Sequence, residues 1–370
     1  MEKIIPEVKD IALYREVVKN MLNPLEIIRE GISNSIDAEA KNIIIRLYRN
    51  TEGNFSIEIQ DDGNGMNLAE IKSFFNLGDS NKDIRNIGQK GLGTKIFFRS
   101  EVLTVITQTG EGELLKAIMR NPWDNLLEMK MPLYELSKET IKSKEHKTVV
   151  RIENYLINNP EKYFNISVLK DYIRWFTAGG SYKHLFANIV ELNSYVKNIQ
   201  VSPRIFIRDE ITGNQEEISG THQFHQPQEN PNVDSSENIY KRSVNYCRHF
   251  GPFHKSTNIN GEYISFQLHA TVLGINCRRS LARLRIGEKY KTRFGCYLTK
   301  DFIPVVKLNS LLPHDKAHHF QLLLNSQNFE LTADRNNISN MQEEKVKWIL
   351  ENAKYIIETE ILPVAQASYL

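Results

Sequence analysis

Residues 30–40, EGISNSIDAEA, decide the fold when they are read together with two glycine-containing stretches, DDGNGM at residues 61–66 and IGQKGLGTK at residues 87–95. The first stretch lies in a predicted helix that follows Asn23 and Pro24. Asn23 is the expected N-cap and Pro24 the first helical residue. Apolar residues recur three and four positions apart along this segment, which is typical of an amphipathic helix.

Three polar residues of this helix are spaced so that they share one stripe. Glu30, Asn34 and Asp37 are separated by four and three positions. Carboxylate and amide oxygens are ligands for Mg²⁺, and a carboxylate can also act as a base toward an attacking water. The stripe alone is equally typical of the solvated face of an amphipathic helix, so it acquires meaning only beside the other two stretches.

The second stretch follows a predicted β-hairpin at residues 42–50 and 54–62, where apolar and polar residues alternate. Asp61 stands at the end of the second strand and precedes two glycines, a pattern that a simple turn would explain. The alternative is a buried carboxylate that accepts a hydrogen bond from an exocyclic amine such as that of adenine. Gly63 and Gly65 would then leave room for a flat ring.

The third stretch belongs to a glycine-rich, polar segment at residues 78–94, directly before a predicted helix at residues 95–100. Successive backbone N–H groups in such a loop form a nest that suits phosphate oxygens. The pattern is not a Walker A loop, since it lacks the Gly-Lys-Ser/Thr ending, and no strand leads into it as in a Rossmann turn. Further strands are predicted at residues 101–110, 113–121 and 146–155.

The order and spacing of the three stretches resemble the Bergerat-fold, or GHKL, ATPases, which include the gyrase B subunit, the ninety-kilodalton heat-shock chaperone, MutL, MORC proteins and histidine kinases. The resemblance covers about residues 10–155 and includes KTVV at residues 147–150, where the family has a threonine-bearing strand. It implies ATP and Mg²⁺ as cofactors. The histidine-kinase branch is not favoured, because Glu30 is acidic and the first histidine of the chain, His146, follows the glycine-rich segment.

The resemblance implies a role for each matching residue. Glu30 would be the general base, Asn34 the Mg²⁺ ligand, and Asp61 the carboxylate that binds adenine with the support of Thr148. Lys147 departs from the family pattern, which has glycine before that threonine in many members. The other positions implied to bind the nucleotide are Asp37, Ala38, Gly63, Gly65, Met66, Lys82, Gly88, Gln89, Lys90, Gly91, Leu92, Gly93, Thr94 and Lys95.

Two segments of the second half carry candidate functions. Residues 325–339, NSQNFELTADRNNIS, resemble the loop with which chaperone-type and MutL-type transducer domains reach the γ-phosphate, which implies a catalytic contact by Arg335. An exposed arginine on a surface turn is the alternative. Residues 277–293 contain seven basic side chains and one acidic one. They could contact nucleic-acid phosphates, pair with an acidic partner, or form a solvated face.

We therefore predict an α+β protein of two domains. Residues 1–185 would form a Bergerat ATP-binding domain, a two-layer α/β sandwich, and residues 186–370 a transducer-like, ribosomal-S5-like α/β domain with a C-terminal helix. The implied function is Mg²⁺-dependent ATP hydrolysis in which ATP closes a lid and dimerises the protein. This cycle would drive a separate effector protein or a nucleic-acid transaction, and MORC-like features associate it with bacterial defence. The alternative is a non-hydrolysing, ATP-dependent switch or scaffold that binds nucleic acid or a partner protein.

The composition sets the remaining limits. The chain has 370 residues, of which 41% are hydrophobic and 25% charged, with a formal net charge of +2, as in an ordinary globular protein. No apolar run approaches the ~18 residues of a membrane-spanning helix, and the first residues lack a signal-peptide core. Three cysteines without CxxC spacing fit a reducing compartment. We expect a cytoplasmic protein without a membrane partner.

Overall fold

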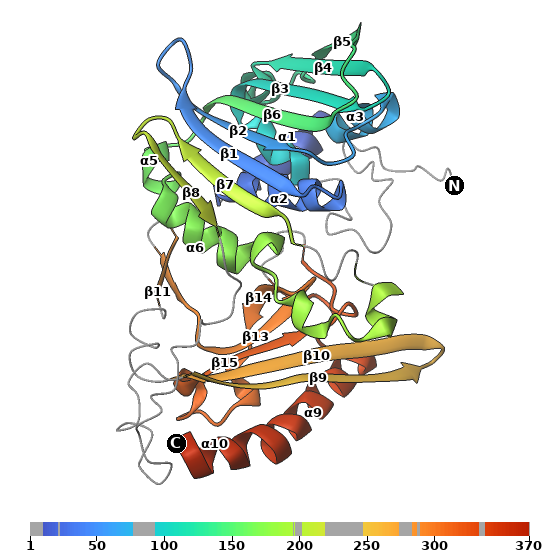
Figure 1. Ribbon diagram of the computed structural model, residues 1–370, viewed down its shortest axis with the longest axis vertical. Helices are drawn as coiled ribbons and strands as arrows, with labels where there is room; N and C mark the ends of the chain where they lie inside the picture. Colours follow the sequence, from blue (N-terminus) through green and yellow to red (C-terminus); the bar gives the residue numbers. More distant parts are fainter. Residues whose placement is uncertain are drawn as a thin grey trace, which may run out of the picture. The chain divides into compact units, whose positions relative to one another are not determined.

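The computed structural model describes residues 10–20, 23–76, 93–194, 196, 202–218, 247–273, 283–286, 289–332 and 337–369 (Figure 1). Contacts divide the chain into two units. Unit 1 comprises residues 1–170 and 202–219, and unit 2 comprises residues 171–201 and 220–370. These units differ from the predicted boundary after residue 185, because residues 202–219 belong to unit 1 and contribute strands to its sheet.

Unit 1 is built on an eight-stranded sheet with the order β5-β4-β3-β6-β2-β1-β7-β8. All neighbouring strands are antiparallel except β1 and β7, which are parallel. The predicted hairpin and the three predicted strands are confirmed, whereas β5 and β8 were not predicted. The strands are β1 (Asn42–Arg49), β2 (Phe55–Asp61), β3 (Ser100–Thr109), β4 (Glu113–Arg120), β5 (Tyr134–Thr140), β6 (His146–Tyr155), β7 (Arg204–Asp209) and β8 (Asn214–Ile218).

Helices cover one face of this sheet. Gly31 lets the central helix α2 approach β2, because a Cβ there would lie 2.4 Å from Cδ1 of Ile59. Unit 1 is thus the predicted two-layer α/β sandwich. Its helices are α1 (Asp10–Asn20), α2 (Glu26–Asp37), α3 (Leu68–Phe75), the 3-10 helix η1 (Gly93–Phe98), α4 (Pro122–Leu127) and α5 (Pro160–Tyr163), and α6 (Ile166–Phe176) begins in unit 1 and continues into unit 2.

Side-chain hydrogen bonds stabilise the N-terminal ends of helices α2 and α3. Helix α2 begins at Glu26, later than predicted, and Asn23 stabilises the turn before it by accepting a hydrogen bond from the N–H of Leu25 (3.1 Å). Helix α3 has a capping box, in which Asn67 accepts from the N–H of Glu70 (3.0 Å) and Glu70 accepts from the N–H of Asn67 (2.8 Å). This box anchors α3 directly after the first glycine stretch.

We call the face of the sheet opposite the helices the outer face. It carries polar side chains, some of which are buried. Successive residues of a strand point to opposite faces, so Glu58 of β2 lies on the side away from Ile59 and α2. Glu58 is 6% exposed, accepts two hydrogen bonds from Arg151 (2.9 and 2.8 Å) and pairs with Arg46 (3.5 Å). Both faces of β2 are therefore buried, although the alternation of its residues predicted only one.

Unit 2 has a five-stranded sheet with the order β14-β13-β15-β10-β9, in which only β13 and β15 are parallel among neighbours. This further sheet domain follows the first, as predicted. Its strands are β9 (Cys247–Ile259), β10 (Glu262–Leu273), β13 (Gly295–Lys300), β14 (Ile303–Lys307) and β15 (Phe320–Asn325), and a separate ribbon joins β11 (Arg283–Ile286) to β12 (Lys289–Thr292).

Both faces of this second sheet are covered. One core cluster joins the sheet to the C-terminal helix, and another joins it to residues between Trp175 and Val196. The helical segments are α9 (Glu344–Ile356), the π-helical turn η7 (Ile357–Ile361), α10 (Leu362–Tyr369) and the 3-10 helices η2 (Ala178–Gly180), η3 (Lys183–Phe186), η4 (Val190–Ser194), η5 (Asn309–Leu311) and η6 (Ala317–His319).

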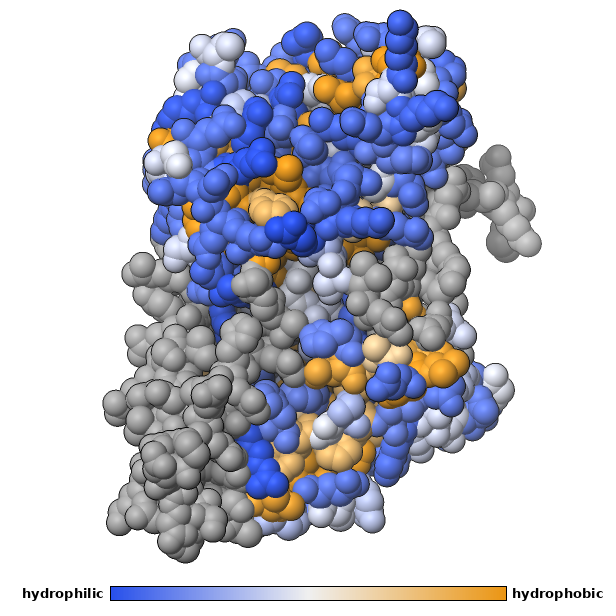
Figure 2. Space-filling model, in the orientation of Figure 1, coloured by the Kyte–Doolittle hydropathy of each residue, from blue (hydrophilic) through white to orange (hydrophobic). Residues whose placement is uncertain are grey.

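On the side that Figure 2 shows, hydrophilic residues cover most of unit 1, and apolar patches are visible on both units. In the parts of the chain that the structure describes, no helix is long and apolar enough to cross a membrane.

Candidate functional site

Helix α2 brings Glu30 and Asn34 together on the side of the sheet that the helices cover. Nδ2 of Asn34 donates a hydrogen bond to Oε1 of Glu30 (3.1 Å), and Glu30 is only 5% exposed. Because Nδ2 faces the carboxylate, the amide oxygen of Asn34 is turned away from it. The Asn34 amide oxygen is therefore not engaged by the Glu30 carboxylate, although the two side chains are adjacent.

Gly93, at the end of the second glycine stretch, lies against this carboxylate. A Cβ at Gly93 would be 1.9 Å from Oε2 and 2.1 Å from Cδ of Glu30. Any residue other than glycine would therefore displace the carboxylate. The close approach brings the first and third sequence stretches into one place.

Asp61 lies at the end of β2 and is 7% exposed. Its Oδ2 accepts a hydrogen bond from the hydroxyl of Ser35 (2.9 Å), and its Oδ1 accepts one from the N–H of Gly63 (2.9 Å). Burial raises the pKa of Asp61 to about 6, although these two hydrogen bonds oppose the shift. Ser35 was not among the predicted site residues. Its position as a polar residue on the buried side of α2 could have indicated it.

Three side chains at directly opposed positions extend this site across the sheet. Asp61 of β2 is opposite Thr148 of β6, which is opposite Thr107 of β3. The Thr107 and Thr148 hydroxyl oxygens are 3.2 Å apart, and Thr107 also accepts a hydrogen bond from the N–H of Met66 (2.8 Å). Thr107 was likewise missed, although it follows Leu103 and Val105 on the inner side of its strand.

The first glycine stretch packs tightly between α2 and β3. A Cβ at Gly63 would lie 2.7 Å from the carbonyl oxygen of Ala38, and the N–H of Asn64 donates to that same oxygen (2.8 Å). Gly65 has a φ of +74°, and a Cβ there would lie 2.2 Å from the carbonyl oxygen of Gln108. Glycine is required at both positions, so the turn is held close to Asp61.

Lys95, a predicted phosphate contact, is fully buried. Its Nζ donates hydrogen bonds to the carbonyl of Phe74 (2.7 Å) and to the hydroxyl of Thr94 (2.7 Å). In this structure the ammonium is therefore directed to the end of α3. Asp37 is partly exposed on the last turn of α2. The remaining predicted positions, Lys82, Gly88, Gln89, Lys90, Gly91 and Leu92, lie outside the described residues.

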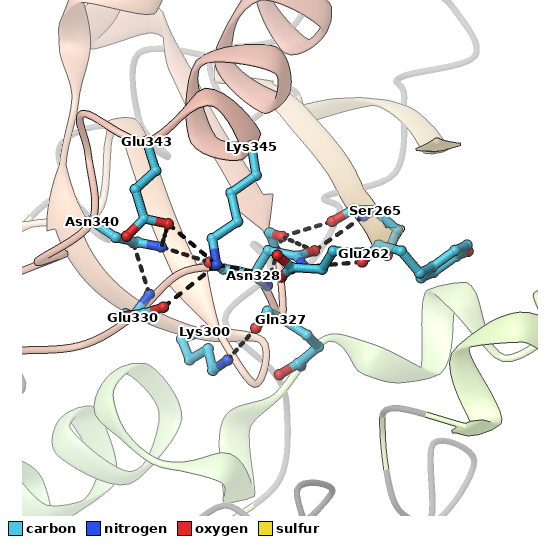
Figure 3. A network of polar contacts seen from close by, with 11 residues as sticks. Glu262, Ser265, Lys300, Gln327, Asn328, Glu330, Asn340, Glu343 and Lys345 are labelled. Atoms are coloured by element: carbon cyan, nitrogen blue, oxygen red, sulfur yellow. Dashed lines mark hydrogen bonds and ion pairs between the residues drawn. The ribbon is translucent and has the colours of Figure 1, made fainter. Parts of the chain in front are cut away.

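The stretch that resembles a phosphate-sensing loop follows β15, and a polar network holds its first part within unit 2 (Figure 3). Oδ1 of Asn328 accepts a hydrogen bond from the N–H of Ser265 (3.1 Å), and its Nδ2 donates to the carbonyl of Tyr263 (3.0 Å). The neighbouring Phe329 is 1% exposed in the core. Arg335 lies outside the described residues, so its contact with phosphate stays a prediction.

Charged side chains complete this network. Lys345 of α9 is surrounded by three carboxylates, those of Glu262 (3.3 Å), Glu330 (3.5 Å) and Glu343 (3.2 Å). The stretch up to residue 332 is therefore tied to β10 and α9 by side-chain contacts (Figure 3).

Only part of the basic segment 277–293 is described, and it includes the ribbon of β11 and β12. Arg293 is 7% exposed, and its guanidinium donates a hydrogen bond to Oδ1 of Asp171 (2.9 Å). The expected basic surface therefore loses Arg293, because this side chain is buried in the fold of unit 2.

Residues 23–152 match the family of histidine kinase-, DNA gyrase B-, and HSP90-like ATPases. This stretch contains the candidate site residues from Glu30 to Thr148. This part of the chain is similar to the GHKL ATPases, and the helix-covered sheet of unit 1 is consistent with their Bergerat fold. The histidine-kinase branch is not indicated.

The chain also resembles MutL. It is 31% identical over 157 residues to the DNA mismatch repair protein MutL of Clostridium beijerinckii. The alignment covers 41% of this chain and 21% of that relative. The chain thus aligns with about a fifth of the length of the MutL protein.

Proposed function

We propose that this chain is an ATPase that binds Mg²⁺-ATP in unit 1 and hydrolyses it. The observation that carries the proposal is the arrangement of Glu30, Asn34 and Gly93 at one place in a domain that also buries Asp61 beneath the same helix. Asn34 and Ser35 are consecutive in α2, so one helix supports both the Glu30–Asn34 pair and the buried Asp61.

The Asp61 end of the site suits adenine. An ionised Asp61 presents hydrogen-bond acceptors only, and the exocyclic amine of adenine is a donor. Guanine has a carbonyl oxygen at the corresponding ring position and would place an acceptor against the carboxylate. Ser35 and the N–H of Gly63 hold the carboxylate in one orientation. Thr107 and Thr148 add hydroxyl groups on the neighbouring strands.

The Glu30 end of the site suits hydrolysis. The Glu30 carboxylate would accept a proton from the attacking water, and backbone N–H groups of the glycine stretch would contact phosphate. The amide oxygen of Asn34 would hold Mg²⁺, which neutralises phosphate charge when bound. Among the described residues, no group of three or more His, Cys, Asp or Glu is arranged to hold a metal ion.

We also propose how the energy of ATP hydrolysis is used. Residues 78–94 would close as a lid over ATP, Arg335 would sense the γ-phosphate, and two copies would associate while ATP is bound. The cycle would act on a separate effector protein or on nucleic acid through residues 277–292, in the cytoplasm and in a role such as bacterial defence. Support comes from the family resemblance and from the relative named as a DNA mismatch repair protein.

One observation favours a second candidate, a switch that binds ATP without hydrolysing it. The Glu30 carboxylate is 5% exposed, with Gly93 against it and Asn34 hydrogen-bonded to it. This carboxylate therefore has little contact with water, which a general base needs. A measurement of phosphate release separates the two candidates, because both bind ATP and only the ATPase turns it over.

Replacing Asp61 by asparagine is expected to weaken ATP binding by about 5- to 150-fold. The amide places an NH₂ donor where an acceptor was, and an unsatisfied buried polar group costs ~1–3 kcal/mol. Calorimetric titration of the wild type with ATP and GTP, and of Asp61→Asn with ATP, tests this. Asp62→Asn is the matched control, since Asp62 accepts hydrogen bonds from the backbone of Lys41 and Asn42 outside the site. Equal ATP affinities of the wild type and Asp61→Asn would place adenine elsewhere.

Asp61 also predicts a pH dependence of stability without nucleotide. Burial raises its folded-state pKa to about 6 from the ordinary 3.8, so the folded protein keeps a proton that the unfolded chain has lost. The free energy of unfolding should therefore fall as the pH rises from about 4 to 6, by on the order of 2–3 kcal/mol. Denaturant unfolding of the wild type and Asp61→Asn across this range tests the difference. Parallel pH profiles of the two proteins would contradict it.

A further inference from the structure

The outer face of the unit 1 sheet contains a cavity of about 480 Å³. Small-molecule sites in proteins have volumes of roughly 300–1,000 Å³. The apolar part of its wall comes from Ile106, Leu114 and Val149 on three adjacent strands. The polar and charged part comes from Arg46, Glu58, Gln60, Gln108, Ser143, Glu145, Lys147 and Arg151.

Two amides and one ammonium of this wall have no partner in the part of the chain that the structure describes. The side chains of Gln60, Gln108 and Lys147 make no hydrogen bond or ion pair there. Gln108 is 7% exposed, and it lies directly opposite Lys147 in the pairing of β3 with β6. Water in the cavity can satisfy these three groups, and a ligand with matching polar atoms can replace that water.

The remaining charges of the wall are mostly neutralised. Arg151 and Arg46 share the carboxylate of Glu58, while Glu145 is exposed. Three basic and two acidic side chains line the cavity, a net charge of +1. The ammonium of Lys147 is therefore the cation available to a ligand.

We infer that this cavity is a binding site for a small organic anion, one whose carboxylate or phosphate contacts Lys147 and Gln108 while an apolar body lies on Ile106, Leu114 and Val149. Charge complementarity at Lys147 selects an anion, and the unpartnered amides supply the additional hydrogen-bond donors that an oxyanion needs.

The site is distinct from the nucleotide site but uses the same strands. Gln60, Lys147 and Gln108 are the immediate chain neighbours of Asp61, Thr148 and Thr107, and consecutive strand residues point to opposite faces. The two sites therefore lie back to back on β2, β6 and β3. The inference does not depend on nucleotide binding, since it rests on the outer face alone.

The test is a titration of the full chain with phenyl phosphate, benzoate and neutral benzamide, in the presence of ADP to fill the nucleotide site. Phenyl phosphate or benzoate should bind with a Kd on the order of millimolar, as expected for fragments of this size, and more weakly at high salt. Benzamide should bind at least about tenfold more weakly than the better anion. The better anion identifies the head group as phosphate or carboxylate.

Variants locate the binding. Lys147→Gln should weaken the better anion by about 10- to 100-fold, whereas Glu145→Gln, which removes a like charge, should strengthen it by ~2-fold. The control Lys138→Gln should bind like the wild type, because that ammonium is already paired with Glu113 (2.6 Å). Failure of both anions to bind, equal affinity of the wild type and Lys147→Gln, or displacement by ADP would overturn the inference.

Discussion

Replacement of Glu30 by glutamine is expected to lower kcat for ATP hydrolysis by about 10²–10⁴-fold while ATP affinity changes little. A general base acts on the attacking water in the transition state, so its loss affects turnover more than ground-state binding. Glutamine keeps the size of the side chain and can still accept the hydrogen bond from Asn34. The fold should therefore be preserved. Phosphate release and calorimetric ATP binding of the same preparation provide the two readouts.

The matched control is Glu26→Gln, the same chemical change at the start of the same helix. Glu26 pairs with Arg29 (3.6 Å) one turn away from the site. Its turnover should stay within about twofold of the wild type, since the change keeps the size of the side chain and lies one helical turn from Glu30. Arg29 is 8% exposed, so the loss of its partner should lower stability and not turnover. Wild-type turnover in Glu30→Gln would exclude Glu30 as the base.

Substitution of Gly93 by alanine should lower turnover by about 100-fold through the same carboxylate. The added Cβ would lie within 1.9–2.4 Å of the three carboxylate atoms of Glu30, so the carboxylate must move. Because the end of a glutamate side chain can rotate aside, the loss of stability should be small. A displacement of about 1 Å at a catalytic group can cost on the order of 10²-fold in rate. Phosphate release and thermal unfolding together test this.

Gly53→Ala is the control for Gly93→Ala. Gly53 lies in the β1–β2 hairpin with nothing within 4 Å of an added Cβ, and its φ of +84° makes alanine strained there. This variant should lose about 1 kcal/mol of stability and keep its turnover. The pair separates an effect on the carboxylate from a general effect of replacing glycine. Full activity of Gly93→Ala would show that Glu30 tolerates displacement.

The parts of the fold that the sequence predicted are those governed by short-range patterns. The helix that carries Glu30 and the β1–β2 hairpin follow from apolar periodicity over neighbouring residues. The position of β7 beside β1 could not be predicted in this way, because the two strands are far apart in sequence and pair in parallel. β8 (Asn214–Ile218) consists mostly of polar residues, so no alternation of apolar and polar residues marks it as a strand.

The residues of the candidate site that the sequence indicated belong to patterns that are uncommon elsewhere in a protein. An acidic residue before two glycines, or glycines at short spacing, stands out in a sequence. Ser35 and Thr107 do not stand out, since buried hydroxyl groups are common in helices and strands and acquire meaning only through their partners, Asp61 and Met66. Their contribution depends on packing between α2, β2 and β3, which a local pattern does not encode.

The most direct test of the proposed function is phosphate release by the purified full chain with Mg²⁺-ATP, measured beside Glu30→Gln. The proposal predicts steady release by the wild type, little release with GTP, and a loss of about 10²–10⁴-fold in the variant. Binding of ATP without any phosphate release by the wild type would contradict an ATPase and favour the switch.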